Sequence, residues 1–202
     1  MTDRSSVLGA VLAGGKSTRM GTDKALLPIN GRPMVQFAAE TLSTVFSNVI
    51  VVGADEEKFG FLNLPIAPDI FEGCGPLGGI HAALTFAKPR SVFVLSCDIP
   101  FIPSRLVDYI VRFDSAEGTR IATFEGMLQP LCGLYNSASL TAIEHDLHAG
   151  KYSILKTLQN LGHAEIPITP DLPFYAPRMF LNVNRPEDYQ TLAISEQGNR
   201  HG

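Results

Sequence analysis

Short apolar runs alternate with stretches of helical periodicity along the first half of the chain. Residues 7–12, 48–52 and 91–96 have the length and continuous apolar character of strands that are buried on both faces. Helical patterns lie between them, over residues 33–46 and 77–88. This alternation predicts βαβ units around a mainly parallel sheet that is covered by helices on both faces.

The second half of the chain predicts a mixture of helices and strands. We expect helices over residues 103–113, 137–149 and 153–161, the last two ending at Gly150 and Gly162. Strands are expected over residues 120–124, 130–135 and 179–183, and another near Ala67. Pro186 is expected to start a terminal helix, and residues 195–202 are expected to form a polar tail.

Size and composition indicate one α/β domain, over residues 1–194, in a chain of 202 residues. The formal net charge of -4 gives no overall basic field, so we expect no nucleic-acid partner. Three cysteines without close spacing argue against a disulfide framework and a zinc cluster, and fit a reducing cytoplasm. The first apolar run is too short for a signal peptide and no run is long enough to span a bilayer, so we expect neither export nor a membrane location.

The loop after the first predicted strand is rich in glycine and in cations. Residues 12–28 read LAGGKSTRMGTDKALLP and contain Gly14, Gly15, Gly21, Lys16, Arg19 and Lys24. Backbone N–H groups and cations that converge at a strand end suit the phosphates of a nucleotide. We therefore expect the chain to bind a nucleotide.

This loop also satisfies a relaxed form of the phosphate-loop pattern of P-loop NTPases, over residues 10–17. Residues 92–98 would then supply an apolar strand that ends in a magnesium-binding Asp. A phosphate loop needs its first small residue at the end of the strand, whereas Val11 and Leu12 continue the strand here. Only Ala13, Gly14 and Gly15 remain for the turn, so we favour a different kind of nucleotide loop.

Polar residues follow several of the other predicted strands. Asp69 follows the strand near Ala67, and Asp98 follows the strand over residues 91–96. Open α/β sheets bind ligands at the carboxyl ends of their strands, and magnesium prefers one or two carboxylates plus phosphate oxygens. We therefore expect Asp98 to be a magnesium ligand, the alternative being an Asp that only forms the turn before Pro100.

Two further segments carry candidate ligand contacts. Residues 73–79 hold four glycines, which allow a backbone to approach a ligand closely, although a merely flexible turn is the alternative. Asn182 and Asn184 lie two apart in a predicted strand, so both amides are expected to face one side. Arg19 and Lys24 are expected to neutralise charge on a pyrophosphate leaving group, unless they belong to an ordinary solvated loop.

Taken together, these segments resemble the signature of nucleotidyltransferases with a Rossmann-like glycosyltransferase-A fold, a three-layer sandwich with a mainly parallel mixed sheet. The segments GPLGG (75–79), CDIPF (97–101), QPLCGLY (129–135) and FLNVNRPED (180–188) resemble one branch, the molybdenum cofactor guanylyltransferases. The resemblance covers nearly the whole chain in order. It implies transfer of GMP from GTP to the terminal phosphate of molybdopterin, with release of pyrophosphate.

The resemblance also implies roles for individual residues. Nucleotide contacts are expected from Leu12, Ala13, Gly14, Gly15, Lys24 and Asp69, and Asp98 is expected to contact both the nucleotide and Mg²⁺. Arg19, Lys24 and Asp98 are expected to be catalytic. Gly21, Gly75, Gly79, Asn182 and Asn184 match positions tied to catalysis or pterin binding, and the last four are expected to contact the acceptor. One departure is Val52, which occupies the place of an Asn that often contacts the nucleotide.

Two other functions remain open on the sequence. The first is a cytidylyltransferase of the same fold that acts on molybdopterin or another small phosphorylated acceptor. Such relatives usually read LAAG where this chain reads LAGG, and the missing methyl group leaves room for a purine. The second is a noncatalytic nucleotide-binding module. Transient partners among cofactor-biosynthesis proteins and molybdoenzyme chaperones are also expected from the resemblance.

Overall fold

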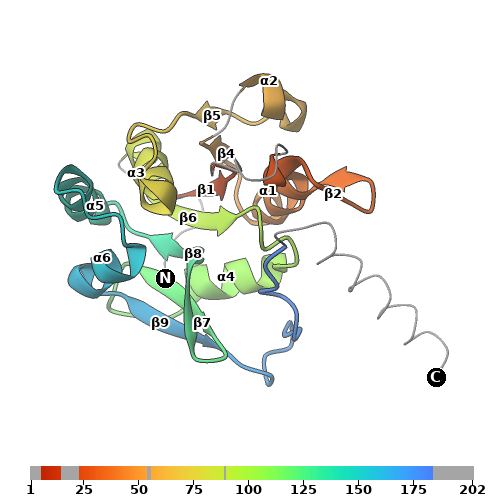
Figure 1. Ribbon diagram of the computed structural model, residues 1–202. Coiled ribbons are helices and arrows are strands. Elements are labelled where there is room, and N and C mark those ends of the chain that lie inside the picture. Colours follow the sequence, from red (N-terminus) through yellow and green to blue (C-terminus); the bar gives the residue numbers. More distant parts are fainter. Residues whose placement is uncertain (1–5, 15–22, 54–55, 89, 184–202) are drawn as a thin grey trace.

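A seven-stranded sheet forms the centre of the protein, in the strand order β5-β4-β1-β6-β8-β7-β9 (Figure 1). The computed structural model describes residues 6–14, 23–53, 56–88 and 90–183. The strands are β1 (Val7–Leu12), β4 (Val49–Val52), β5 (Ile66–Ala67), β6 (Ser91–Ser96), β7 (Arg120–Phe124), β8 (Met127–Tyr135) and β9 (Ala164–Ile168). β5, β4, β1 and β6 are parallel, β8 runs antiparallel to both of its neighbours, and β9 is parallel to β7.

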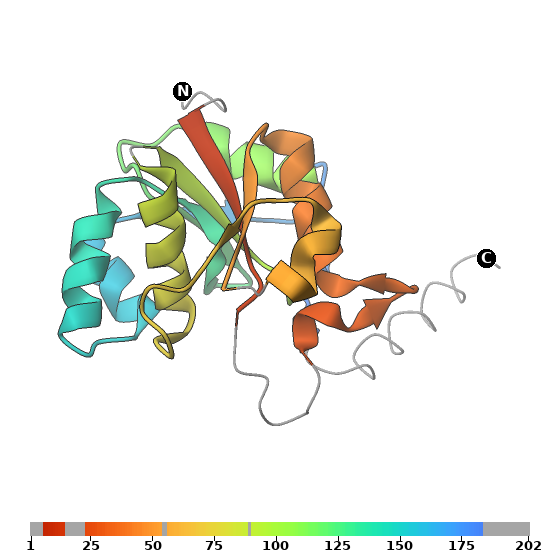
Figure 2. The same ribbon diagram turned by 90° about the horizontal axis from the view of Figure 1, so that it is seen from above.

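Helices cover both faces of this sheet, as the alternating pattern predicts. Figure 2 shows α3 (Gly75–Ala87), α5 (Ser139–His148) and α6 (Ile154–Leu161) on one side, and α1 (Met34–Val45) and α4 (Ser104–Arg112) on the other. Each side has its own apolar cluster, because the buried strands alternate their side chains between the two faces. Val11, Val51 and Phe93 point to the α1–α4 side, whereas Leu12, Val52 and Val94 point to the α3–α5 side. The expected three-layer α/β architecture is confirmed.

Small elements complete the described chain. A short hairpin, β2 (Pro28–Ile29) and β3 (Arg32–Pro33), turns at Asn30 and Gly31, which both have positive φ. The 3-10 turns η2 (Lys24–Leu26) and η3 (Gly60–Leu62) and the one-turn helix α2 (Glu56–Phe59) carry the chain between the strands. The sequence reading missed the hairpin, α2 and β9.

The expected strand over residues 179–183 is wrong. Turn hydrogen bonds hold this segment, from the Met179 N–H to the Ala176 carbonyl and from the Leu181 N–H to the Arg178 carbonyl. Its buried side chains enter two different apolar clusters, since Met179 and Phe180 join the α1–α4 side whereas Val183 packs with Ile29 and Met34. The segment therefore crosses the end of the sheet and does not extend it.

The remaining boundaries differ by a few residues. Pro33 is the N-cap of α1 and not part of its first turn, α3 begins at Gly75, and β8 begins at Met127. The terminal helix expected from Pro186, the domain boundary after residue 194 and the polar tail lie outside the described residues. Within the described residues, no helix has the length and apolar character needed to cross a membrane.

Candidate active site

Four neighbouring parallel strands end at the same level of the sheet. Leu12 of β1 pairs with Val52 of β4 and Ser96 of β6, and Val52 in turn pairs with Ala67 of β5. Hydrogen bonds continue the alignment one residue further, from the Ala13 N–H to the Val52 carbonyl (3.1 Å) and from the Cys97 N–H to the Leu12 carbonyl (3.1 Å). The loops that leave these strands therefore share one edge of the sheet, which is where open α/β sheets bind ligands.

The backbones of Gly14 and Gly53 touch at this edge. A Cβ added to Gly14 would lie 3.0 Å from the Gly53 Cα, and one added to Gly53 would lie 2.9 Å from the Gly14 Cα. Gly53 also has a φ of +69°, a conformation that L side chains rarely adopt. Both glycines are therefore required for the close approach of the two loops, and the site has no side chain at either position.

Asp69 lies beside this glycine pair. Its Oδ2 is 3.2 Å from the place that a Gly53 Cβ would take, and its Oδ1 is buried without a hydrogen-bond partner among the described residues. Burial, with a smaller contribution from the negative charge of Glu72, raises the pKa of this carboxyl above its usual range. A buried carboxylate oxygen without a partner is costly, so Asp69 is a candidate for a hydrogen bond from a ligand or a water molecule.

Lys24 begins the 3-10 turn η2, whose position is fixed at both ends. The Asp23 carboxylate caps the turn by accepting from the Ala25 N–H (3.2 Å) and lies 3.7 Å from the Lys58 ammonium. The buried Ala25 side chain belongs to the same apolar cluster as Ala13 and Cys97. These contacts hold the turn, and Lys24 with it, against the α1–α4 side of the sheet.

The charges of Lys24 and Asp98 both act on the buried Cys97 thiol, directly beyond the end of β6. Burial raises the pKa of the Cys97 thiol strongly, the negative charges of Asp98 and Asp23 raise it further, and the positive charge of Lys24 lowers it. One buried sulfur atom is thus within Coulombic range of both Lys24 and Asp98. The thiol itself stays protonated and inert.

Asp98 is half-buried directly beyond the end of β6, and its backbone is held by a distant segment. The Val183 N–H donates to the Asp98 carbonyl at 2.8 Å, and the Val183 side chain is buried against Ile29 and Met34. Asn182, the residue before, is exposed. The structure therefore brings Asn182 to the same edge as Asp98, although not through the strand that the sequence predicted.

Gly75 and Gly79 occupy the first turns of α3. Gly75 has a φ of +63°, and a Cβ there would meet no described atom within 4 Å. Gly79 is buried, and a Cβ there would lie 3.3 Å from the Leu12 Cδ2, so the missing side chain lets α3 approach the end of β1. Contacts of either glycine with an acceptor remain predictions. The expected contacts of Gly15, Arg19, Gly21 and Asn184 lie outside the described residues.

The fold and this arrangement agree with the comparisons. Residues 9–164 match the family model described as a MobA-like NTP transferase domain. The chain belongs to the MobA-like NTP transferase family.

Relatives and solved structures are consistent with this assignment. A protein of Aquifex aeolicus named probable molybdenum cofactor guanylyltransferase is 37% identical over 92% of this chain and 90% of its own length. A crystal structure of an Aquifex aeolicus protein has a TM-score of 0.75 at 36% identity and covers 88% of this chain and 93% of its own. The molybdopterin-guanine dinucleotide biosynthesis protein A of Archaeoglobus fulgidus has a TM-score of 0.78 at 24% identity, with 94% and 99% covered, and so supports the fold.

Val52, the departure from the family pattern, does not present its side chain to the site. It is buried on the α3 side of the sheet in the same apolar cluster as Leu12. Gly53, the first residue beyond β4, has no side chain. The site of this chain therefore presents backbone where the family pattern often has an Asn side chain. Sequence reasoning missed Gly53, Asp23 and Val183, and only Asp23, a turn-forming residue next to Lys24, carried a local signal.

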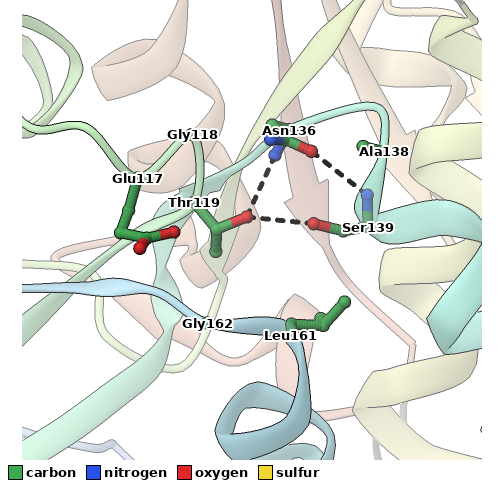
Figure 3. Close-up of a pocket in the computed structure, with 8 residues that line it drawn as sticks. All are labelled: Glu117, Gly118, Thr119, Asn136, Ala138, Ser139, Leu161 and Gly162. Carbon is green, nitrogen blue, oxygen red and sulfur yellow. Dashed lines mark hydrogen bonds between the residues drawn. The ribbon is translucent and has the colours of Figure 1, made fainter.

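A hollow lined by Glu117, Gly118, Thr119, Asn136, Ala138, Ser139, Leu161 and Gly162 lies at the opposite edge of the sheet (Figure 3). β8 ends there, because Tyr135 pairs with Val92 near the start of β6. Its polar groups bind one another: the Thr119 and Ser139 hydroxyls are 2.9 Å apart, and the Ser139 N–H donates to the Asn136 Oδ1 at 3.1 Å. This hollow joins β7, β8 and α5 and is separate from the transferase site.

Proposed function

We propose that this protein transfers GMP from GTP to the terminal phosphate of molybdopterin, releases pyrophosphate and uses Mg²⁺. The observation that carries the proposal is the shared edge of strand ends, where Asp69 lies against a pair of touching glycines and Asp98 follows β6. The family supports nucleotidyl transfer, and the names of the relatives supply the acceptor and the base.

The order of the strands gives the direction in which GTP would lie. Asp69 follows β5 and Asp98 follows β6, with β4 and β1 between them. The Asp69 carboxylate reaches inward to Gly53 and Gly14 at the ends of β4 and β1, which leaves the β6 side of the edge, with Asp98, for the phosphates. We place the base at Asp69 and the phosphates between Lys24 and Asp98.

Asp69 and the glycine pair favour guanine over the other bases. Guanine carries two adjacent donors, the N1–H and the 2-amino group, which a carboxylate accepts together. The glycine pair sets the place of this carboxylate, because the missing side chains let the ends of β1 and β4 close on each other and bring Asp69 against both.

The chemistry requires no covalent enzyme intermediate. A phosphate oxygen of molybdopterin attacks the α-phosphorus of GTP, the bond from that phosphorus to the bridging oxygen breaks, and the electron pair leaves with pyrophosphate. Lys24 holds the phosphates in line and offsets the charge that develops on the leaving group. Asp98 is a half-buried carboxylate, and together with the phosphate oxygens of the nucleotide it would provide the ligands that magnesium prefers. The ion, when bound, would neutralise further negative charge on the phosphates.

A reconstituted transfer assay tests the proposal. The purified protein is given molybdopterin, MgCl₂ and either GTP or CTP, and the dinucleotide and pyrophosphate are quantified. We expect the guanine dinucleotide and an equal amount of pyrophosphate, with severe loss in Lys24→Ala. Product from CTP in preference to GTP, or no dinucleotide from either, would contradict it.

A further inference from the structure

The strand β8 leaves its pairing with β7 close to the candidate site. Ile121 of β7 pairs with Gly133, but the next residue, Ala122, pairs with Gln129. Residues 130–132, which we call the β8 bulge, therefore face no residue of β7. Bulges of this kind redirect a strand and are common beside active sites.

The β8 bulge lies at the transferase edge of the sheet. On the β6 side, Cys132 still pairs with Leu95, the residue before the end of β6. The single step from Ile121 to Ala122 of β7 faces the four steps from Gly133 to Gln129 of β8, so Leu131 and Pro130 bow out of the ladder beside the end of β6. Both residues are half-buried.

Tyr135 holds the β8 bulge by a single hydrogen bond. Its hydroxyl donates to the Pro130 carbonyl at 2.7 Å, while its ring is 1% exposed in the apolar cluster on the α3 side. Burial raises the pKa of this hydroxyl, so it remains a donor at every pH used for an assay. The ring is fixed by packing, and its hydroxyl fixes the carbonyl of the bulge.

On the α3 side of the sheet, half-buried apolar side chains come from β8 and from the segment before α3. Leu128 and Leu131 of β8, and Phe71 and Cys74 of the segment before α3, pack against one apolar cluster. Gly75, the first residue of α3, follows Cys74 directly. A flat heterocycle such as a pterin is suited to a surface of this composition.

We propose that Tyr135 is a positioning residue for the acceptor: its hydroxyl keeps the β8 bulge in the shape that receives the pterin beside Asp98. This inference rests on the proposed function, since it concerns the second substrate of the same site. Without the hydroxyl, the bulge samples other shapes. The apparent affinity for the acceptor then falls by the fraction of molecules in the competent shape.

The variant Tyr135→Phe tests this inference, because it removes the hydroxyl and keeps the buried ring. The matched control is Tyr109→Phe on α4, where the ring packs against Phe113 and Phe174 and the hydroxyl makes no hydrogen bond within the described residues. Initial rates are measured with molybdopterin varied at saturating GTP, and with GTP varied at saturating molybdopterin. We expect the acceptor KM of Tyr135→Phe to rise about 3- to 10-fold, the effect of one neutral hydrogen bond, with the GTP KM unchanged.

A second variant, Leu131→Ala, alters the β8 bulge and leaves the hydroxyl in place. It is expected to raise the acceptor KM in the same selective way, and it replaces Tyr135→Phe if that protein fails to fold in a thermal unfolding measurement. An unchanged acceptor KM, or an equal rise of both KM values, would overturn the inference while the wild-type activity still supports the proposed function. Absence of any dinucleotide from the wild-type protein would instead overturn the proposed function and the inference with it.

Discussion

Asp98 is the residue whose chemistry the proposed function needs most directly, and it can be altered without disturbing its surroundings. Its backbone carbonyl, not its side chain, accepts the hydrogen bond from Val183. A change from carboxylate to amide therefore removes the negative charge, and with it the magnesium ligand that the proposed function assigns, but leaves that contact in place.

We expect Asp98→Asn to lower kcat by at least about 100-fold, the scale on which lost transition-state electrostatics act. The control is Asp108→Asn on α4, whose carboxylate pairs with Arg112 on the surface. Transfer rates and thermal unfolding of both variants are compared with the wild type. Activity of Asp98→Asn within a few-fold of wild type would contradict the assigned role.

His81 makes the stability of the protein sensitive to acid. It is 3% exposed on α3, and neither ring nitrogen has a hydrogen-bond partner among the described residues. Burial lowers its pKa below the usual value, and Lys88 and His148 lower it further. Glu144, with an oxygen 3.8 Å from Nε2, raises the pKa and opposes the effect of burial only in part.

A histidine that is held neutral stabilises the fold above its unfolded pKa, and this contribution is lost as the pH falls toward the lower folded value. The free energy of unfolding should therefore decline below about pH 6.5, with His81 contributing a slope of up to about 1.4 kcal/mol per pH unit. We expect His81→Leu to flatten this part of the profile, as measured by urea unfolding at a series of pH values. His145→Leu, at a ring that is 76% exposed, is the control. Identical slopes for His81→Leu and wild type would refute the assignment.

At the scale of elements, the contact between the ends of β1 and β4 links fold and site. Gly14 and Gly53 touch, and Asp69 lies against both. A side chain at Gly53 would meet the Gly14 Cα at 2.9 Å and would also require a positive φ. The two strand ends must then separate, and the Asp69 carboxylate moves with them.

We expect Gly53→Ala to cost at least about 1 kcal/mol of stability, from the strained backbone alone, and to weaken GTP binding. The control is Gly60→Ala in η3, which makes the same chemical change at an unstrained position. No described atom lies within 4 Å of the added Cβ there, and φ is not positive. Denaturant unfolding and isothermal titration with GTP measure the two effects. If Gly53→Ala and Gly60→Ala bind GTP equally well, the close approach is not part of the site.

Sequence reasoning found the elements with strong periodicity and missed those defined by distant contacts. The central strands and the large helices were found from their apolar runs and helical periodicity. The polar residues at the strand ends were found from their positions directly after those runs. The hairpin at Asn30-Gly31 was missed although this dipeptide is a strong turn signal, because its strands have only two residues each. The segment over residues 179–183 has the composition of a strand, but the Val183 N–H bonds to Asp98 instead of to a neighbouring strand.

The strand-end positions of the candidate residues were predictable from the sequence, their geometry was not, and their roles stay predictions. Asp69, Asp98 and Lys24 were expected from their positions after strands or in the glycine loop, and the structure brings Asp69 and Asp98 to one edge. The partnerless Oδ1 of Asp69, the contact between Gly14 and Gly53, and the β8 bulge depend on how segments pack, which no local pattern encodes. Gly79 shows the same limit, since its packing against Leu12 is visible only in three dimensions.

At the scale of the whole molecule, ligand binding should be visible as stability. A nucleotide that binds only the folded protein raises its unfolding temperature, and GTP at 100 times its Kd contributes about 2.7 kcal/mol. For a chain of this size that is roughly 5–10 °C. We expect this shift with GTP and Mg²⁺, and smaller shifts with CTP, ATP and UTP, in a differential scanning measurement at equal concentrations. A shift for CTP as large as that for GTP would favour the cytidylyltransferase alternative.

The reversed direction of β8 has one more consequence. It divides the sheet into a parallel block of β5, β4, β1 and β6, which would hold the donor, and a block of β8, β7 and β9, whose nearest residues would meet the second substrate. Under the proposed function, substitutions in the second block would change which acceptor is used and would leave the residues that handle the triphosphate unchanged. A fold divided in this way is suited to acquire new acceptors one strand at a time.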